Sequence, residues 1–227
     1  MDTLVNELKG WEKVRVRQQE QMRDAILEIV SAPGMPLTVA DVCARAGVSR
    51  PTFYKYFPTL GAAMLHVFNW VMDEMIRESG VSDDSGLTGL EVYLAEARAA
   101  FAVSCRRPEL TRFISFLDYT FRTIGMTAEE SAAIESTALR AADHERQIVR
   151  RGQADGSIRS DISANEIVNA VGSALLGLRQ RIQITESYLA DGVAMGYRVH
   201  ELELAAWGSY LAAPPNGNGT PPERAEV

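Results

Sequence analysis

The chain has 227 residues, of which 46% are hydrophobic, and a formal net charge of −7. That length and composition allow one large or two small domains with a real core. No run approaches the roughly 18 to 20 apolar residues of a membrane span, and the first residues lack the basic and then apolar pattern of a secretion signal. We therefore expect a folded cytoplasmic protein without membrane contact.

Charge is distributed unevenly along the chain. Residues 1–60 hold eight Lys and Arg against seven Asp and Glu, which leaves +1, so the remainder carries −8. Nucleic acid would be repelled by that acidic remainder, and any contact with it should be confined to the N-terminal segment. The two cysteines, Cys43 and Cys105, form no CxxC pair, so we expect two free thiols.

Helical periodicity runs through almost every segment after residue 20, and the pattern predicts an all-α protein of about nine helices. Helix starts are marked by a hydroxyl residue with an acid three positions later, as in a capping box. These pairs are Thr38 with Asp41, Thr88 with Glu91, Thr127 with Glu130, and Ser163 with Glu166. Glycine and proline mark the predicted ends, at Gly34, Gly47, Pro58, Gly80, Pro108, Gly125, Gly152 and Gly156.

The segment TVADVCARAGVSRPTFYKYF predicts two short helices joined by a glycine turn. Thr38 caps the first helix, Gly47 makes the turn, Ser49 caps the second helix, and Pro51 stands in its first turn, where a missing N–H costs nothing. Such a pair is a helix-turn-helix, whose second helix suits the major groove of DNA. The alternative is a helical hairpin with ordinary core aromatics.

In the second helix, Phe53 and Phe57 are four residues apart and should be buried. The remaining side chains are left for DNA: arginine and lysine donate to guanine, a threonine methyl meets thymine, and tyrosine hydroxyls donate to phosphate. The side chains of this helix predicted to contact DNA are Arg50, Thr52, Tyr54, Lys55 and Tyr56.

The run from Arg23 to about Val67 resembles the N-terminal DNA-binding domain of the TetR family of bacterial transcription regulators. The resemblance implies a three-helix DNA-binding head in residues 21–67, a linking helix from about Thr59 to Ser79, and a helical ligand-binding and dimerisation domain in residues 68–212. It also implies a homodimer that leaves double-stranded operator DNA when a small-molecule effector binds. With the positions that the resemblance adds, the predicted DNA-binding residues are Thr38, Ser49, Arg50, Pro51, Thr52, Tyr54, Lys55 and Tyr56. We expect a repressor rather than an activator.

One position departs from the family pattern. Where the family usually has a lysine aimed at a phosphate, at the start of the linking helix, this chain has Leu60. The N-terminal extension, residues 1–20, could replace that contact as a basic arm on DNA, or form an extra helix packed on the head. Its basic residues are Lys9, Lys13, Arg15 and Arg17, and its apolar residues at helical spacing are Leu4, Leu8 and Trp11.

The segment PELTRFISFLDYTFRTI is apolar around nearly its whole circumference, so we expect it to be buried. In the family the corresponding helices line a cavity, which implies an apolar or aromatic effector. An ordinary aromatic core explains the same residues. The candidate pocket residues are Phe101, Phe113, Phe116, Tyr119 and Phe121.

The last two long helices, 163–184 and about 189–212, are the predicted dimer surface, with simple packing inside one chain as the alternative. Small residues four apart permit close helix contact, and large apolar residues add area. The candidates are Ser173, Gly177, Leu204, Trp207 and Leu211. Residues 213–227 are rich in Pro and Gly and are predicted to be disordered.

An enzyme is not predicted. The three histidines are scattered, and no HExxH, GxSxG or phosphate-binding glycine loop is present. We predict no catalytic residue, no metal and no cofactor. A helical interaction or ligand-binding module that no longer binds DNA remains the alternative function.

Overall fold

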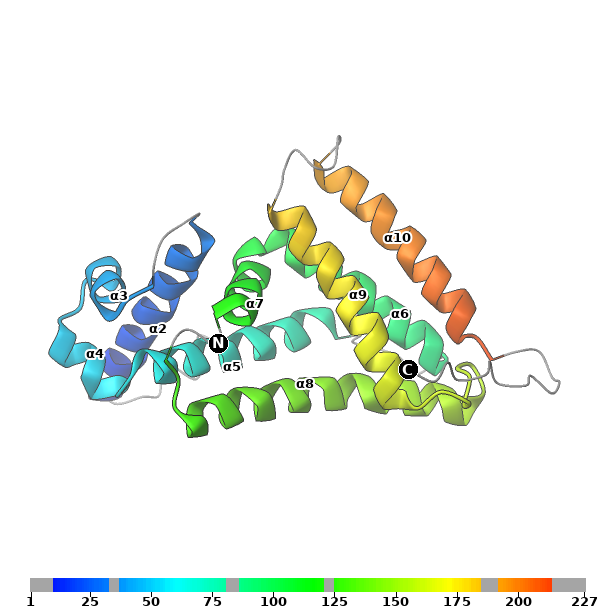
Figure 1. Cartoon of the computed structure of the whole chain (residues 1–227), viewed down its shortest axis with the longest axis horizontal. Helices are drawn as coiled ribbons and strands as arrows, with labels where there is room; N and C mark the ends of the chain where they lie inside the picture. The colour runs from blue at the N-terminus through cyan, green and yellow to red at the C-terminus, as the bar shows by residue number, and fades with distance from the viewer. Residues whose placement is uncertain (1–9, 33–36, 81–85, 121–124, 185–191, 214–227) are drawn as a thin grey trace. The chain divides into compact units, whose positions relative to one another are not determined.

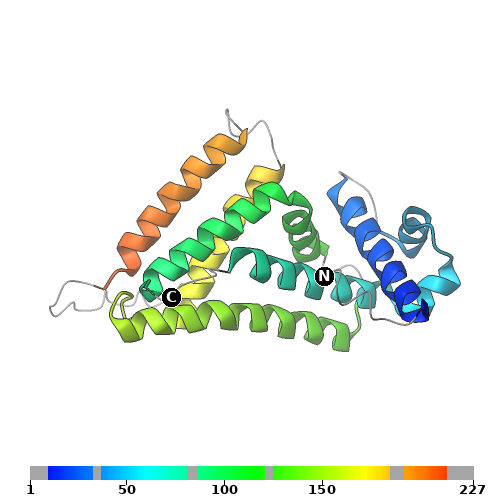
Figure 2. The ribbon, with the colours of Figure 1, turned by 180° about the vertical axis from the view of Figure 1, so that it is seen from behind.

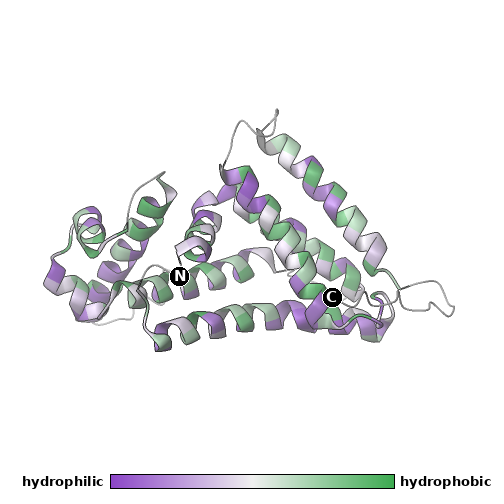
Figure 3. Ribbon diagram, in the orientation of Figure 1, coloured by the Kyte–Doolittle hydropathy of each residue, from purple (hydrophilic) through white to green (hydrophobic). Residues whose placement is uncertain are grey.

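The computed structural model describes residues 10–32, 37–80, 86–120, 125–184 and 192–213. Within these ranges the chain is all-α, as predicted, with nine helices (Figure 1). They are α2 (Gly10–Ser31), α3 (Val39–Ala46), α4 (Arg50–Tyr56), α5 (Leu60–Ser79), α6 (Gly89–Arg106), α7 (Pro108–Thr120), α8 (Ala128–Asp155), α9 (Ala164–Ile184) and α10 (Gly192–Leu211). Hydrophilic and hydrophobic residues share each helix (Figure 3), as expected for amphipathic helices.

The predicted helix starts are confirmed. In all four capping pairs the backbone N–H of the acid donates to the hydroxyl, at 3.2 Å for Thr38, Thr127 and Ser163 and 3.3 Å for Thr88. Each acid in turn accepts the backbone N–H of its hydroxyl partner. Two orphan backbone donors are thereby satisfied at every start.

The predicted ends are confirmed only in part. Gly47 and Gly156 end their helices with left-handed φ angles of 66° and 79°, which glycine adopts at no steric cost. Gly152, however, lies inside α8, and Pro108 opens α7 instead of only closing α6. Gly152 is buried in that helix. An added Cβ would lie 2.5 Å from the Ile158 side chain, so a glycine is needed here for close packing. Gly34 lies outside the described residues.

The described chain divides into two compact units. The first combines residues up to Glu74 with Arg107–Thr137, and the second combines Met75–Arg106 with the residues from Ala138 on. α7 belongs to the first unit because it packs on α2. The functional division at residues 21–67 and 68–212 stays a prediction. No described helix has a stretch long and apolar enough to cross a membrane.

The first unit has a core formed by α2 to α5, with α3 lying against both α2 and α4. Its buried apolar residues include Met22, Ile26, Ile29, Val42, Phe53, Phe57, Met64 and Phe68. Burial of a side chain of this size stabilises the fold by about 1.5 to 3 kcal/mol. This core therefore holds the short helices α3 and α4, which could not persist alone.

The second unit has its core where α6, α9 and α10 pack on one another (Figures 1 and 2), joined by residues of α8. The buried cluster includes Val92, Val149, Ile167, Val171, Leu175, Leu204 and Leu211. Leu204 and Leu211 are each only 1% exposed, so the chain's own packing already accounts for them.

Over its described residues the N-terminal extension is not an extra helix packed on the head, and its contact with DNA stays a prediction. Residues 10–31 form one continuous helix, so the extension and the first helix of the head are not separate elements. Trp11 is 64% exposed and therefore does not pack on the head. Leu4, Leu8 and Lys9 lie outside the described residues, as do Phe121 and the tail from Pro214 on.

Candidate nucleic-acid interface

The turn between α3 and α4 is fixed by local hydrogen bonds. Gly47 has φ 66° and ψ 31°, and its backbone N–H donates to the Cys43 carbonyl. The N–H of Val48 donates to the same carbonyl at 3.1 Å. A left-handed residue at this point turns the chain sharply while satisfying the last carbonyls of α3. The sequence therefore predicts this turn correctly.

The start of α4 is also built as predicted. The Ser49 hydroxyl accepts the backbone N–H of Thr52 at 3.2 Å, and Pro51 occupies the first turn. The hydroxyls of Ser49 and Thr52 lie 2.8 Å apart and share a hydrogen bond. The hydroxyl of Thr52 is thus engaged within the chain.

One face of α4 is anchored in the core. Phe53 is fully buried and Phe57 is 5% exposed, and their ring centroids are 5.7 Å apart. Arg50 in the first turn of α4 and Tyr54 and Lys55 in the second are exposed, Tyr54 by 53%. Thr52 and Tyr56 are half-buried, while Thr38, Ser49 and Pro51 are exposed.

Tyr56 has a partner that the sequence did not reveal. Its hydroxyl donates to the side-chain oxygen of Gln18 on α2 at 2.6 Å. The single phenolic proton is therefore used inside the head, whereas the prediction had assigned it to a phosphate. The ammonium group of Lys55 lies 5.6 Å from the centre of the Tyr56 ring.

The groups behind α4 are held in their neutral forms. Burial raises the pKa of the Cys43 thiol, which the nearby Arg50 only partly offsets. Burial also lowers the pKa of His66, and the charge of Arg23 lowers it further. The His66 ring lies 5.3 Å from that of Phe57 at the end of α4. The charge of the interface is consequently carried by its exposed lysine and arginine side chains.

The helix that follows α4 begins at Leu60, as the motif predicted. The Thr59 hydroxyl accepts the backbone N–H of Ala62 at 2.9 Å and donates to Glu130 at the start of α8. The sequence predicts for Glu130 only the local cap with Thr127. Its second partner, 71 residues away, has no signal in the sequence.

The candidate pocket residues do not share one environment. Phe113 is fully buried in the first unit, and Phe101 is 1% exposed in the second. Phe116 is half-buried, whereas Tyr119 is 88% exposed. The high exposure of Tyr119 shows that α7 is not buried around its whole circumference as the sequence suggested.

Polar groups are buried near Phe101 in the second unit. The imidazole of His200 stacks on the Phe101 ring at 4.2 Å and is 1% exposed. Neither of its nitrogens makes a hydrogen bond of normal geometry, although the Ala97 carbonyl is close enough to act on its pKa. Gln183 donates to the Ser104 carbonyl at 2.8 Å, while its own side-chain oxygen is unpartnered.

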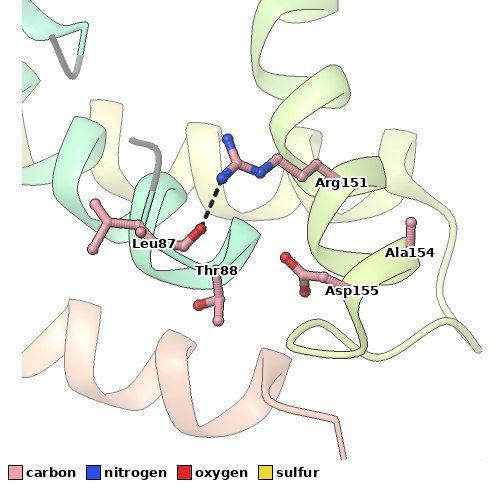
Figure 4. Close-up of a pocket in the computed structure, with 6 residues that line it drawn as sticks. Leu87, Thr88, Arg151, Ala154 and Asp155 are labelled. Atoms are coloured by element: carbon pink, nitrogen blue, oxygen red, sulfur yellow. Dashed lines mark hydrogen bonds between the residues drawn. The ribbon is translucent and has the colours of Figure 1, made fainter. Parts of the chain in front are cut away.

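An open pocket of about 550 Å³ lies where the start of α6 meets the end of α8 (Figure 4). Its lining residues are Gly86, Leu87, Thr88, Arg151, Ala154 and Asp155. Arg151 donates to the Leu87 carbonyl at 2.7 Å, and Asp155 accepts the Gly89 N–H at 2.7 Å. Both charged groups thus hold the start of α6, and no predicted pocket residue lies here.

The candidate dimer residues fall into two groups. Ser173 and Gly177 are exposed on α9, and Trp207 is half-buried on α10. Leu204 and Leu211 face the core of their own chain. Other large side chains are exposed on α10, among them Leu202 at 71% and Tyr210 at 49%.

Comparison with known proteins supports this interpretation of the head. Residues 23–59 match the model of a family described as bacterial regulatory proteins, tetR family. No curated protein matches the chain. The resemblance to the TetR family that the motif indicated is therefore confirmed.

Solved structures show the same fold. A TetR family transcription regulator from Marinobacter aquaeolei VT8 is 21% identical, with a TM-score of 0.65, over 89% of this chain and 100% of its own. Regulatory protein TetR from Rhodobacter sphaeroides is 17% identical, with a TM-score of 0.65, over 85% of this chain and 98% of its own. The fatty acid degradation regulator FadR from Bacillus halodurans is 15% identical, with a TM-score of 0.63, over 82% of this chain and 97% of its own. At these identities the likeness concerns the fold.

Proposed function

Because the chain carries the N-terminal domain of the TetR family, we propose that it is a sequence-specific, DNA-binding transcriptional repressor of the cytoplasm. The observation that carries the proposal is the amphipathic build of α4. Phe53 and Phe57 are buried, while Arg50, Tyr54 and Lys55 are exposed. Rigid anchoring of a short helix is what base reading requires, since side chains must reach base edges in a fixed register.

A homodimer is part of the proposal. One short helix reads few bases, and each mismatch costs only about 1 to 3 kcal/mol, so two heads on a palindromic site are needed for useful discrimination. The exposed faces of α9 and α10 support such a dimer. Ser173 and Gly177 permit close approach, and Trp207, Leu202 and Tyr210 add partly exposed apolar area.

The proposed signal is a small apolar or aromatic effector that binds the helical body. α5 follows α4 directly and runs through residues of both compact units, so a shift of this helix would change the placement of the head. A coupling of about 1 to 3 kcal/mol, or 5- to 150-fold in affinity, suffices for a switch.

The first test is selection of bound sequences from a random DNA pool with the full-length protein. The winning sequence is then titrated at several salt concentrations. Enrichment of a palindrome with a steep salt dependence is expected. No enrichment, with or without added aromatic effectors, would favour a helical interaction module that does not bind DNA.

A further inference from the structure

The first two turns of α2 carry a concentration of positive charge in an otherwise acidic protein. Residues 10–17 contain Lys13, Arg15 and Arg17 against Glu12, a net charge of +2. Both arginines are exposed. Although the whole chain carries −7, this segment is locally positive and would attract a polyanion.

The same two turns extend the side of α2 that packs on the head. Trp11, Val14 and Gln18 follow one another at helical spacing, and the stripe continues through Met22 and Ala25. Met22 and Ala25 are buried, whereas Trp11 is 64% and Val14 55% exposed. α2 therefore overhangs the head by about two turns, and its overhanging face meets little of the described chain.

The overhang lies beside the end of α4. Gln18 accepts the hydrogen bond from Tyr56, the last residue of α4, at 2.6 Å. Seven residues of helix span about 10 Å, so Trp11 lies within about 10 Å of Gln18 along the axis of α2. Arg15, one turn before Gln18, is closer still. A duplex that is read by α4 would thus pass within reach of these side chains.

Unlike the first turns of α2, the first turn of α5 has a negative side chain placed against it. A helix N-terminus with free N–H groups ordinarily favours phosphate. Here Leu60 brings no charge, the Thr59 hydroxyl takes the Ala62 N–H, and the Glu130 carboxylate binds Thr59. An added Cβ on Gly61 would overlap a carboxylate oxygen of Glu130. A negative group is therefore already placed against the first turn of α5.

From these two observations we propose that the first two turns of α2 contact the DNA backbone, with Arg15 and Arg17, which project from different sides of the helix, as separate phosphate ligands. These arginines bind phosphate in place of the first turn of α5, where the Glu130 carboxylate would repel a phosphate group. This inference rests on the proposed function as a DNA-binding regulator. It adds a second contact region, outside the helix-turn-helix, that fixes the head on the duplex without reading sequence.

The test compares Arg15→Ala and Arg17→Ala, singly and together, with Arg150→Ala in the full-length protein. Arg150 is an exposed arginine of α8, so its removal changes the net charge equally at a site where we propose no DNA contact. Affinity for the selected operator and for random DNA is measured by fluorescence anisotropy between 50 and 200 mM salt. Each α2 substitution removes one proposed phosphate contact from each protomer, so in the homodimer it should lower the slope of log K against log salt by about 2 and weaken both complexes alike.

Removal of the carboxylate gives a second, opposite readout. Glu130→Gln removes the charge and keeps one side-chain oxygen as an acceptor, while an amide NH2 replaces the second oxygen; the carboxylate oxygens of Glu130 accept from the Thr59 hydroxyl and the Thr127 N–H. Glu135→Gln makes the same charge change at an exposed position of the same helix. Glu130→Gln should raise affinity for both DNAs several-fold more than Glu135→Gln does. Equal effects of the two substitutions would mean that Glu130 does not repel phosphate.

The outcomes separate this inference from the proposed function. If the wild-type protein binds no DNA, both the proposed function and this inference are wrong. If it binds but the Arg15→Ala, Arg17→Ala double variant matches Arg150→Ala in slope and affinity, only the α2 surface is overturned. Loss of dimer in that variant by sedimentation, with DNA affinity per dimer unchanged, would also overturn it. Circular dichroism establishes that each variant is folded.

Discussion

The hydroxyl of Tyr56 on α4 donates to the side-chain oxygen of Gln18 on α2 at 2.6 Å. This bond joins the end of the predicted recognition helix to a helix that begins 46 residues earlier in the chain, at Gly10. It separates two tyrosines that the sequence had treated alike, because Tyr54 points to solvent and is 53% exposed.

Tyr56→Phe should therefore lower the stability of the fold, whereas Tyr54→Phe should weaken DNA binding. Removal of the Tyr56 hydroxyl leaves Gln18 without its partner and should lower the free energy of unfolding by about 1 kcal/mol. Tyr54→Phe should leave stability within about 0.5 kcal/mol and weaken DNA binding, since its hydroxyl is free for a phosphate. Urea unfolding and operator titration of both variants make the comparison. Equal stability of the two variants would contradict the assignment.

Arg50→Ala should weaken the operator complex far more than the complex with random DNA. A bidentate contact to guanine contributes about 1 to 3 kcal/mol of discrimination, and Arg50 is exposed at the start of α4. The ratio of the two dissociation constants is the measurement. A loss of the same size on both DNAs would show that Arg50 contacts only phosphate.

Gly89→Ala should strongly destabilise the second unit. An added Cβ would overlap the backbone of Gly152 on α8, and backbone atoms cannot move aside as a side-chain end can. We expect a cost of about 3 kcal/mol or more, at the upper end for overpacking. Gly86→Ala is the matched control, because a Cβ there has no atom within 4 Å. Unfolding of the two variants at the same urea midpoint would refute the close contact.

Gly177 offers a test of the dimer surface. A Cβ at this exposed position of α9 has no atom of the chain within 4 Å, so Gly177→Leu should not harm the folded protomer and should stabilise the helix itself. If α9 pairs closely with its counterpart, the larger side chain should weaken the dimer at least tenfold by analytical ultracentrifugation. Ala132→Leu, at an exposed position of α8, should leave the dimer intact. A dimer unaffected by Gly177→Leu places the interface elsewhere.

The contribution of His200 to stability should fall when the protein is acidified below about pH 6.5. Burial lowers the pKa of His200 from its ordinary value of 6.5, so the unfolded chain binds a proton that the folded chain resists. Stability from this group is present above pH 6.5 and is lost as pH falls, by at most about 1.4 kcal/mol per pH unit.

His200→Phe provides the check. It keeps an aromatic ring against Phe101 and removes both the titration and two unpartnered nitrogens, so it should reduce the loss of melting temperature between pH 7.5 and 5.5. The remaining pH dependence would include His66, whose pKa is also lowered by burial. An unchanged pH dependence in the variant would show that His200 does not titrate in this range.

Features that depend on neighbouring residues were predictable from the sequence alone. The capping pairs such as Ser163 with Glu166, the left-handed turn at Gly47 and the proline start of α4 all follow from hydrogen bonds within a few residues. The backbone groups at a helix end must find partners nearby, so a local pattern suffices. The buried face of α4 follows from the four-residue spacing of Phe53 and Phe57 for the same reason.

Only the tertiary structure decided the rest. It placed Gly152 inside a helix where the sequence suggested an end, used Leu204 and Leu211 in the chain's own core, and left Tyr119 exposed. It also joined Glu130 to Thr59, 71 positions apart. Periodicity indicates that a helix has an apolar face, but the element that covers this face depends on how distant helices pack. The same packing decides which donor a carboxylate binds outside its own helical turn.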